Sequence, residues 1–183
     1  MDLNQSRLIH KYAQAFYNVY GNEVTLDTFW HIKHASGHLK YIPGVLFFLA
    51  LVDIEEKKQH EMVEILLQRL QLPESVGRLI YLLMEHHRIN LLPFVLQSFI
   101  NIYQEKKKIL LFNITTVSPL DSENKKEIES FLHRLSGCHI LSEYSIDNKL
   151  IAGIRALNRN YLWEYSIESR IWAVTNSLLE QKA

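Results

Sequence analysis

The sequence predicts an α+β protein in which an N-terminal six-helix bundle precedes a small C-terminal α/β domain. Two features support this fold class. Apolar residues recur three or four positions apart through most of the first hundred residues, which is the period of amphipathic helices. Beyond Lys108, short runs rich in β-branched and aromatic residues indicate strands. We place the boundary at the lysine run 106–108, so the predicted domains span residues 1–106 and 107–183.

Six helices are expected in the first domain. Glycine, proline and capping residues mark their ends, and Asp53 is a suitable N-cap for the fourth helix. Short connections favour antiparallel neighbours in a bundle. The predicted helices cover approximately residues 8–20, 26–39, 45–52, 54–70, 74–87 and 91–107.

The second domain is expected to alternate strands and helices. Asp121 or Ser122 is predicted to cap its first helix, and Asp147-Asn148 forms a turn between two strands. The predicted strands are 109–117, 139–146, 150–157 and 161–165. The predicted helices are 122–135 and 167–179.

The composition excludes several classes of protein. Of the residues, 48% are hydrophobic, which is enough to form a core and argues against a disordered chain. Twenty basic residues balance twenty acidic ones, so no net charge favours nucleic acid or an anionic membrane surface as the main partner. The single cysteine, Cys138, cannot form an internal disulfide and fits a reducing compartment.

No stretch of the sequence is predicted to cross a membrane. A membrane-spanning helix needs about 20 apolar residues, and the longest strongly apolar run, 42–52, contains Pro43 and Gly44. The N-terminal residues show no secretory signal pattern. These features lead us to expect a soluble cytoplasmic protein, which another component must bring to any membrane at which it works.

The first and fifth predicted helices have unusually wide apolar faces. A helix in a bundle needs an apolar stripe of a little over 100°. The apolar residues cover roughly 160° of the first helix and roughly 200° of the fifth. One interpretation is that the fifth helix is the centre of the bundle. The other is that the two helices form a groove for an amphipathic helix from another chain.

Three segments carry a resemblance to a known family. Residues 12–16, YAQAF, match a Tyr-Ala-x-Ala pattern, and residues 83–89 match Leu-x-Glu-x-x-Arg-Leu with isoleucine in the last position. Residues 146–154, IDNKLIAGI, match a strand, an acid-led turn and a strand with a small-Gly pair. The chain resembles the delta subunits of F-type ATP synthases, whose mitochondrial counterpart is the oligomycin-sensitivity-conferring protein.

The resemblance implies a non-catalytic peripheral-stalk subunit that resists rotational torque during proton-driven ATP synthesis. The first domain would bind the N-terminal helix of an alpha subunit of the catalytic head, and the second would contact the C-termini of the b subunits. The implied groove residues are Tyr12, Ala13, Phe16, Leu79, Leu82 and Leu83. The implied residues of the stalk-binding domain are Ile151, Gly153, Ile154, Ser166 and Arg170.

The resemblance also implies what the protein does not bind. We expect no cofactor, no metal, no nucleic acid, no small-molecule substrate and no direct insertion into a membrane. The expected location is the cytoplasmic face of the bacterial inner membrane, as a peripheral part of the complex. The chain departs from the family pattern at four positions: Ala156, Tyr165, Glu168 and Ser169.

The sequence also offers two other classes of function. His31, His34 and His38 share one face of the second predicted helix and suggest a zinc enzyme. A solvated face is favoured, because one helix rarely supplies a closed tetrahedral site. The other alternative is a general helical adaptor protein unrelated to ATP synthesis. The groove hypothesis predicts that Phe16→Asp and Leu82→Asp abolish binding of an alpha-subunit peptide without unfolding the domain.

Overall fold

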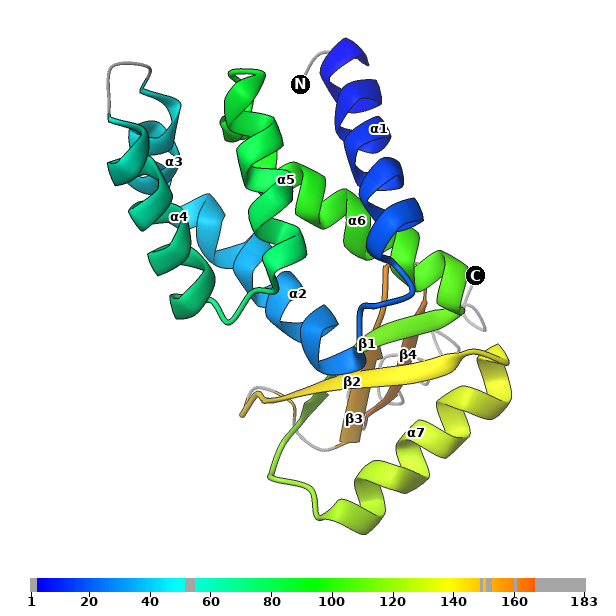
Figure 1. The fold of residues 1–183 in the computed structure, drawn as a ribbon. Helices are drawn as coiled ribbons and strands as arrows, with labels where there is room; N and C mark the ends of the chain where they lie inside the picture. The colour runs from blue at the N-terminus through cyan, green and yellow to red at the C-terminus, as the bar shows by residue number, and fades with distance from the viewer. Residues whose placement is uncertain (1–2, 52–54, 149, 151–152, 160, 167–183) are drawn as a thin grey trace, which may run out of the picture. The chain divides into compact units, whose positions relative to one another are not determined.

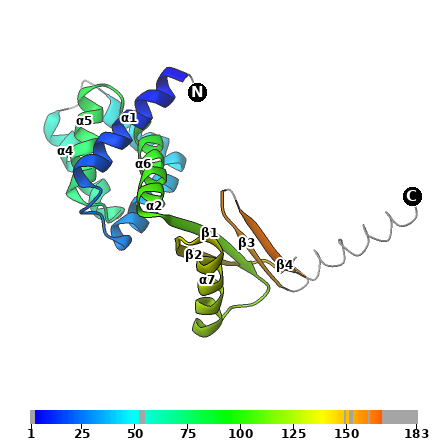
Figure 2. The same cartoon turned by 90° about the vertical axis from the view of Figure 1, so that its right-hand side faces the viewer.

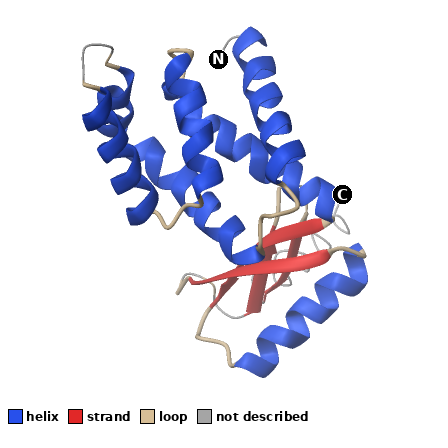
Figure 3. Cartoon of the chain, viewed as in Figure 1, coloured by secondary structure: helices blue, strands red, loops and turns tan. Residues whose placement is uncertain are grey.

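The chain forms two compact units, Met1–Lys106 and Lys107–Ala183, and each is described by itself (Figure 1). The computed structural model describes residues 3–51, 55–148, 150, 153–159 and 161–166. The first unit is helical, and the second combines a sheet with a helix (Figure 3). The predicted α+β class is therefore confirmed.

The first unit contains all six predicted helices. They are α1 (Leu3–Tyr20), α2 (Leu26–Tyr41), α3 (Pro43–Ala50), α4 (Glu56–Arg69), α5 (Glu74–Glu85) and α6 (Leu92–Lys107). A short 3₁₀ turn, η1 (Ile89–Leu91), precedes α6. The predicted cap Asp53 lies outside the described residues. Glu55 directly precedes α4 and makes no side-chain capping bond.

Helix α6 provides the centre of the helical unit. Its buried residues are Leu92, Pro93, Val95, Leu96, Phe99, Ile100, Ile102 and Tyr103. The ring of Phe99 lies 5.0 Å from that of Phe16 on α1, in an edge-to-face arrangement. The wide apolar face of α5 also made this helix a candidate for the central position. Leu82 of α5 is instead substantially exposed, so α5 lies at the periphery on that side.

The second unit contains a mixed four-stranded sheet with the order β2-β1-β3-β4. The strands are β1 (Ile109–Thr116), β2 (His139–Ile146), β3 (Gly153–Leu157) and β4 (Leu162–Ser166). Strands β1 and β2 are parallel, whereas β3 is antiparallel to both β1 and β4. A parallel pair requires a crossover connection, and α7 (Ser122–Ser136) provides it along the sheet (Figure 2).

Local signals explain the ends of α7 and β3. The carboxylate of Asp121 accepts a hydrogen bond from the Asn124 backbone N–H at 2.8 Å, so the predicted cap is confirmed. Gly137 ends the helix with a φ of 66°, a left-handed conformation that glycine adopts without strain. Leu150, the predicted start of β3, belongs instead to the preceding turn and donates its N–H to the Asp147 carbonyl, whereas residues 151–152 lie outside the described residues. The predicted helix 167–179 lies outside the described residues.

Tyr144 links β2 to α7 and gives the second unit a predicted pH dependence. Its hydroxyl lies 3.2 Å from the Glu129 carboxylate. Burial, and secondarily the charge of Glu129, raises the pKa of Tyr144 to about 12. An unfolded tyrosine loses its proton near pH 10. Between about pH 10 and 12 the unfolded state therefore gives up this proton first, so stability falls as the pH rises.

We expect Tyr144→Phe to reduce this alkaline loss of stability. The phenylalanine variant has no proton to lose at this position, so its unfolding midpoint in urea should fall less between pH 9 and pH 11. The measurement is urea unfolding of both full-length chains at the two pH values, followed by circular dichroism. Equal losses in the two chains would show that Tyr144 does not contribute.

Candidate helix-binding groove

A hollow of about 260 Å³ lies between α1 and α5. We call it the α1–α5 groove. Its lining is mostly apolar or aromatic, with one charged residue. The lining residues are Tyr12, Ala15, Phe16, Val19, Tyr20, Arg78, Leu79 and Leu82. The surface therefore offers an apolar trough between two helices, and Figure 1 shows these helices running alongside each other in the first unit.

Four of the six predicted groove residues line this hollow. Phe16 and Leu79 are buried and form its floor, and Leu82 is 41% exposed. Tyr12 is half-buried at its edge. The other two, Ala13 and Leu83, are completely buried and do not line the groove.

Sequence reasoning left four lining residues out of the predicted site. Ala15, Val19 and Tyr20 belong to the wide apolar arc of the first helix, which is the signal that could have identified them. Val19 is 64% exposed, which is unusual for a large apolar residue in a helix that also contributes to the core. Arg78 carries no apolar signal, and only the structure places it at the groove.

The width of the apolar arc on α1 explains why the groove exists. One line of residues, Ile9, Ala13 and Phe16, is buried against the unit's core. The second line includes Ala15 and Val19, which are exposed and line the groove. A helix that needed only a core stripe would carry polar residues there. The extra apolar residues therefore form a surface that the unit itself does not cover.

Two arginine–tyrosine hydrogen bonds connect α1 to α5 and to the turn that follows α5. The Arg78 guanidinium donates to the Tyr20 hydroxyl at 3.3 Å. Arg88 donates to the Tyr12 hydroxyl at 3.1 Å. Arginine is charged at physiological pH, and the hydrogen bond to Tyr20 raises the pKa of Arg78 further. Each end of the apolar trough is therefore marked by a positive charge.

The predicted stalk-binding residues are only partly described. Gly153 and Ile154 begin β3, and the backbone of Ser166 pairs with Gly153 across to β4. Ile151 and Arg170 lie outside the described residues. Gly153 has a φ of 120°, a backbone conformation that residues with a side chain rarely adopt, which explains the glycine at this position.

The structure accounts for one departure from the family pattern and leaves the others without an explanation. Ala156 is completely buried and pairs with Ile114 on one side and Trp163 on the other. A small residue therefore stands beside a large indole at this position. The side chain of Tyr165 is not described, and Glu168 and Ser169 lie outside the described residues.

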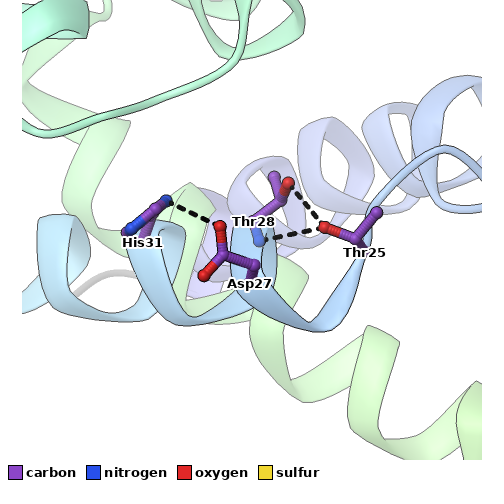
Figure 4. Close-up of polar contacts among 4 residues, drawn as sticks. All are labelled: Thr25, Asp27, Thr28 and His31. Atoms are coloured by element: carbon purple, nitrogen blue, oxygen red, sulfur yellow. Dashed lines mark hydrogen bonds and ion pairs between the residues drawn. The ribbon is translucent and has the colours of Figure 1, made fainter.

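The histidines of α2 do not assemble a metal site. The His31 ring lies 3.9 Å from the Asp27 carboxylate, in the first turns of the helix (Figure 4). At the same end of the helix, the Thr25 hydroxyl accepts a hydrogen bond from the Thr28 backbone N–H at 3.2 Å. His38 contacts the backbone carbonyl of His34 through Nδ1 at 2.8 Å. In the described ranges, no group of three histidine, cysteine or acidic residues is arranged to hold a metal ion.

Over the same residues, no helix has the length and apolarity that crossing a membrane requires.

Comparison with known proteins identifies the family. The model of the ATP synthase delta (OSCP) subunit family matches residues 8–178. The chain belongs to this family. It is a non-catalytic subunit of the F-type ATP synthase and part of the peripheral stalk. The comparisons give no support to a general helical adaptor unrelated to ATP synthesis.

Several relatives carry the same description over most of their length. The ATP synthase subunit delta of Syntrophus aciditrophicus is 21% identical over 96% of this chain and 97% of that protein. The subunit delta of Ligilactobacillus salivarius is 21% identical over 98% of this chain and 100% of its own. The Parabacteroides distasonis subunit delta is 29% identical over a shorter match, 60% of this chain and 61% of that protein.

A solved structure shares the fold. A chain in the cryo-EM structure of the Toxoplasma gondii mitochondrial ATP synthase hexamer superimposes with a TM-score of 0.60. The match covers 94% of this chain and 97% of that chain, at 20% sequence identity. At this identity the likeness establishes the fold alone.

Proposed function

We propose that this subunit binds the N-terminal helix of an alpha subunit in the α1–α5 groove and contacts the b subunits through its second unit. The observation that carries the proposal is the uncovered apolar trough between α1 and α5. An amphipathic helix lies in such a groove with anchors at helical spacing. The family to which the chain belongs supports an alpha subunit as the source of that helix.

The dimensions of the groove suit a short helical segment. Tyr12 and Val19 line it and are seven residues apart on α1, which corresponds to about 10 Å along the axis. A partner helix would place anchors at positions i, i+3 or i+4, and i+7 over that length. Burying exposed apolar side chains such as Leu82 and Val19 favours association, and well-packed anchors slow dissociation.

Slow dissociation is what the peripheral stalk requires. Rotation of the central stalk exerts torque on the catalytic head, and the head must be held still for ion flow to drive ATP synthesis. The apolar groove would provide the attachment on the head side. We assign binding of the b subunits to the second unit on family membership alone. This unit contains the predicted stalk-binding residues Ile151, Gly153, Ile154, Ser166 and Arg170.

We also propose that the complex lies at the cytoplasmic face of a bacterial inner membrane, with this subunit at its periphery. Bacterial proteins described as ATP synthase subunit delta match nearly the whole chain, which supports this location.

Leu82→Asp is expected to weaken binding of an alpha-subunit peptide by at least a hundredfold. The substitution replaces an exposed apolar side chain of the groove with a carboxylate, so docking would lose the apolar contact and would have to remove water from the charge. The probe is a synthetic peptide of the first twenty or so residues of the alpha subunit from the same organism. Its affinity for the full-length chain is measured by isothermal titration calorimetry.

The matched control is Ile65→Asp, because Ile65 is similarly exposed on α4 and does not line the groove. The control should bind the peptide like the wild type. Equal affinity of folded Leu82→Asp and wild-type chains would exclude the groove as the binding site. Phe16→Asp is not a suitable variant, because Phe16 is buried against Phe99 and the charge would destabilise the unit. We therefore expect Phe16→Asp to destabilise the unit, in contrast to the expectation from the sequence that the domain stays folded.

A further inference from the structure

The α1–α5 groove has a guanidinium group near each end, and this arrangement bears on which helix it selects. Arg78 is bonded to Tyr20 and Arg88 is bonded to Tyr12. The two tyrosines are eight residues apart on α1, which corresponds to about 12 Å along the helix axis. The apolar lining, including Val19 and Leu82, lies between these positions.

Both guanidinium groups retain donors for a further partner. A guanidinium carries five N–H donors in a planar fork, and each tyrosine hydroxyl uses one of them. Among the described residues, no carboxylate lies within ion-pair distance of Arg78 or Arg88. Glu74 and Glu23, which line a neighbouring hollow together with Arg78, raise the pKa of Arg78 less than Tyr20 does. Both arginines are exposed, so a docking helix can reach them.

The tyrosines restrict where the guanidinium groups can lie. An exposed arginine samples many rotamers, and ordering it costs conformational entropy on binding. A hydrogen bond to a half-buried tyrosine reduces that cost, because Tyr12 and Tyr20 are themselves fixed at the edge of the groove. The remaining donors are therefore presented beside the trough before a partner arrives, in a geometry suited to carboxylates.

We propose that Arg78 and Arg88 select a partner helix that carries a carboxylate near each end of its apolar stripe. The two acidic residues would be seven or eight positions apart, because about two helical turns match the separation of Tyr12 and Tyr20. The apolar residues supply affinity, and the two charged contacts set the register of the helix in the groove. This inference rests on the proposed helix-binding function and adds the chemistry of the partner.

The test compares one peptide in two forms on the full-length chain. The first form is the natural alpha-subunit N-terminal peptide, and in the second every glutamate and aspartate is replaced by glutamine or asparagine. At low salt we expect the amide form to bind about twenty-fivefold more weakly, from about fivefold for each of the two charged contacts. Raising the salt concentration should narrow this difference, because exposed charges are screened.

Arg78→Gln combined with Arg88→Gln provides the second arm. This double variant should bind the natural peptide about twenty-fivefold more weakly than the wild type and should no longer distinguish the two peptide forms. Circular dichroism confirms that the variant is folded. Tyr12→Phe combined with Tyr20→Phe keeps both charges and removes the restraint on them, so its preference for the acidic peptide should be smaller but present.

The outcomes separate this inference from the proposed function. One outcome is that both peptide forms bind the wild-type chain with equal affinity and that neither binds the Leu82→Asp variant. This result would keep the α1–α5 groove as the docking site and overturn selection by the arginines. A bound natural peptide without two acids at the stated spacing would overturn it as well. Failure of the natural peptide to bind at all would overturn both proposals.

Discussion

Phe99→Ala is expected to lower the free energy of unfolding of the helical unit by about 3–5 kcal/mol, the usual cost of removing a large aromatic side chain from a core. Phe99 is completely buried in α6, and its ring lies 5.0 Å from Phe16 and 6.0 Å from Tyr103. Small domains are stable by only about 5–15 kcal/mol in total. The variant should therefore populate the unfolded state of this unit near physiological temperature.

The control for this prediction is a phenylalanine on the same helix. Phe94 is 43% exposed, so Phe94→Ala removes less buried surface and should cost no more than about 1–2 kcal/mol. Urea unfolding of the full-length chains, followed by far-ultraviolet circular dichroism, measures both changes. Similar losses for the two variants would show that α6 does not form the centre of the unit as described.

The double variant Val19→Asp and Leu82→Asp is expected to abolish ATP synthesis driven by an imposed proton gradient in membrane vesicles. Both residues are exposed in the α1–α5 groove, so two charges would face any docked helix. ATP hydrolysis by the catalytic head should persist, because this subunit contributes no catalytic group. Loss of synthesis with retained hydrolysis is the result expected when the head is no longer held against rotation.

A matched double variant separates this effect from a general change in surface charge. Phe47 and Ile65 are exposed apolar residues of the same unit that do not line the groove. Phe47→Asp combined with Ile65→Asp should leave coupled synthesis near the wild-type rate. Normal synthesis in vesicles that contain the groove variant would contradict the assigned role of the groove.

The fold class could be predicted because hydrophobic periodicity changes character near Lys108. Helix ends were predicted to within a few residues where glycine, proline or a capping side chain marks them. The end of α5 was placed at His87, although the helix stops at Glu85. His87 has a φ of 54°, and the sequence gives no sign that a non-glycine residue adopts a left-handed conformation there.

The order of the strands was not predictable from local patterns. Strand β3 pairs with β1, although β2 precedes it in the chain. Such pairing depends on contacts between residues far apart in sequence, which propensity and periodicity do not report. The same limit explains why no sequence pattern indicated the bonds of Arg78 to Tyr20 and Arg88 to Tyr12, whose partners are 58 and 76 residues apart.

The groove was partly predictable for a specific reason. An excess apolar arc shows that a helix has more apolar surface than one neighbour can cover, which is visible from α1 alone. Periodicity gives the direction of a side chain but not its depth. The site implied by the resemblance therefore includes the fully buried Ala13 and Leu83 beside the exposed Leu82, and it omits Val19.

Site-directed cross-linking in the assembled complex tests the central claim most directly. The native Cys138 is first replaced by serine, and a single cysteine is introduced as Leu82→Cys or, outside the groove, as Ile65→Cys. With a short photoactivated cross-linker, Leu82→Cys should join this subunit to the N-terminal segment of an alpha subunit, and Ile65→Cys should not. Two results would contradict the docking of that helix between α1 and α5. One is that Leu82→Cys cross-links to a different subunit, and the other is that only Ile65→Cys cross-links to the alpha subunit.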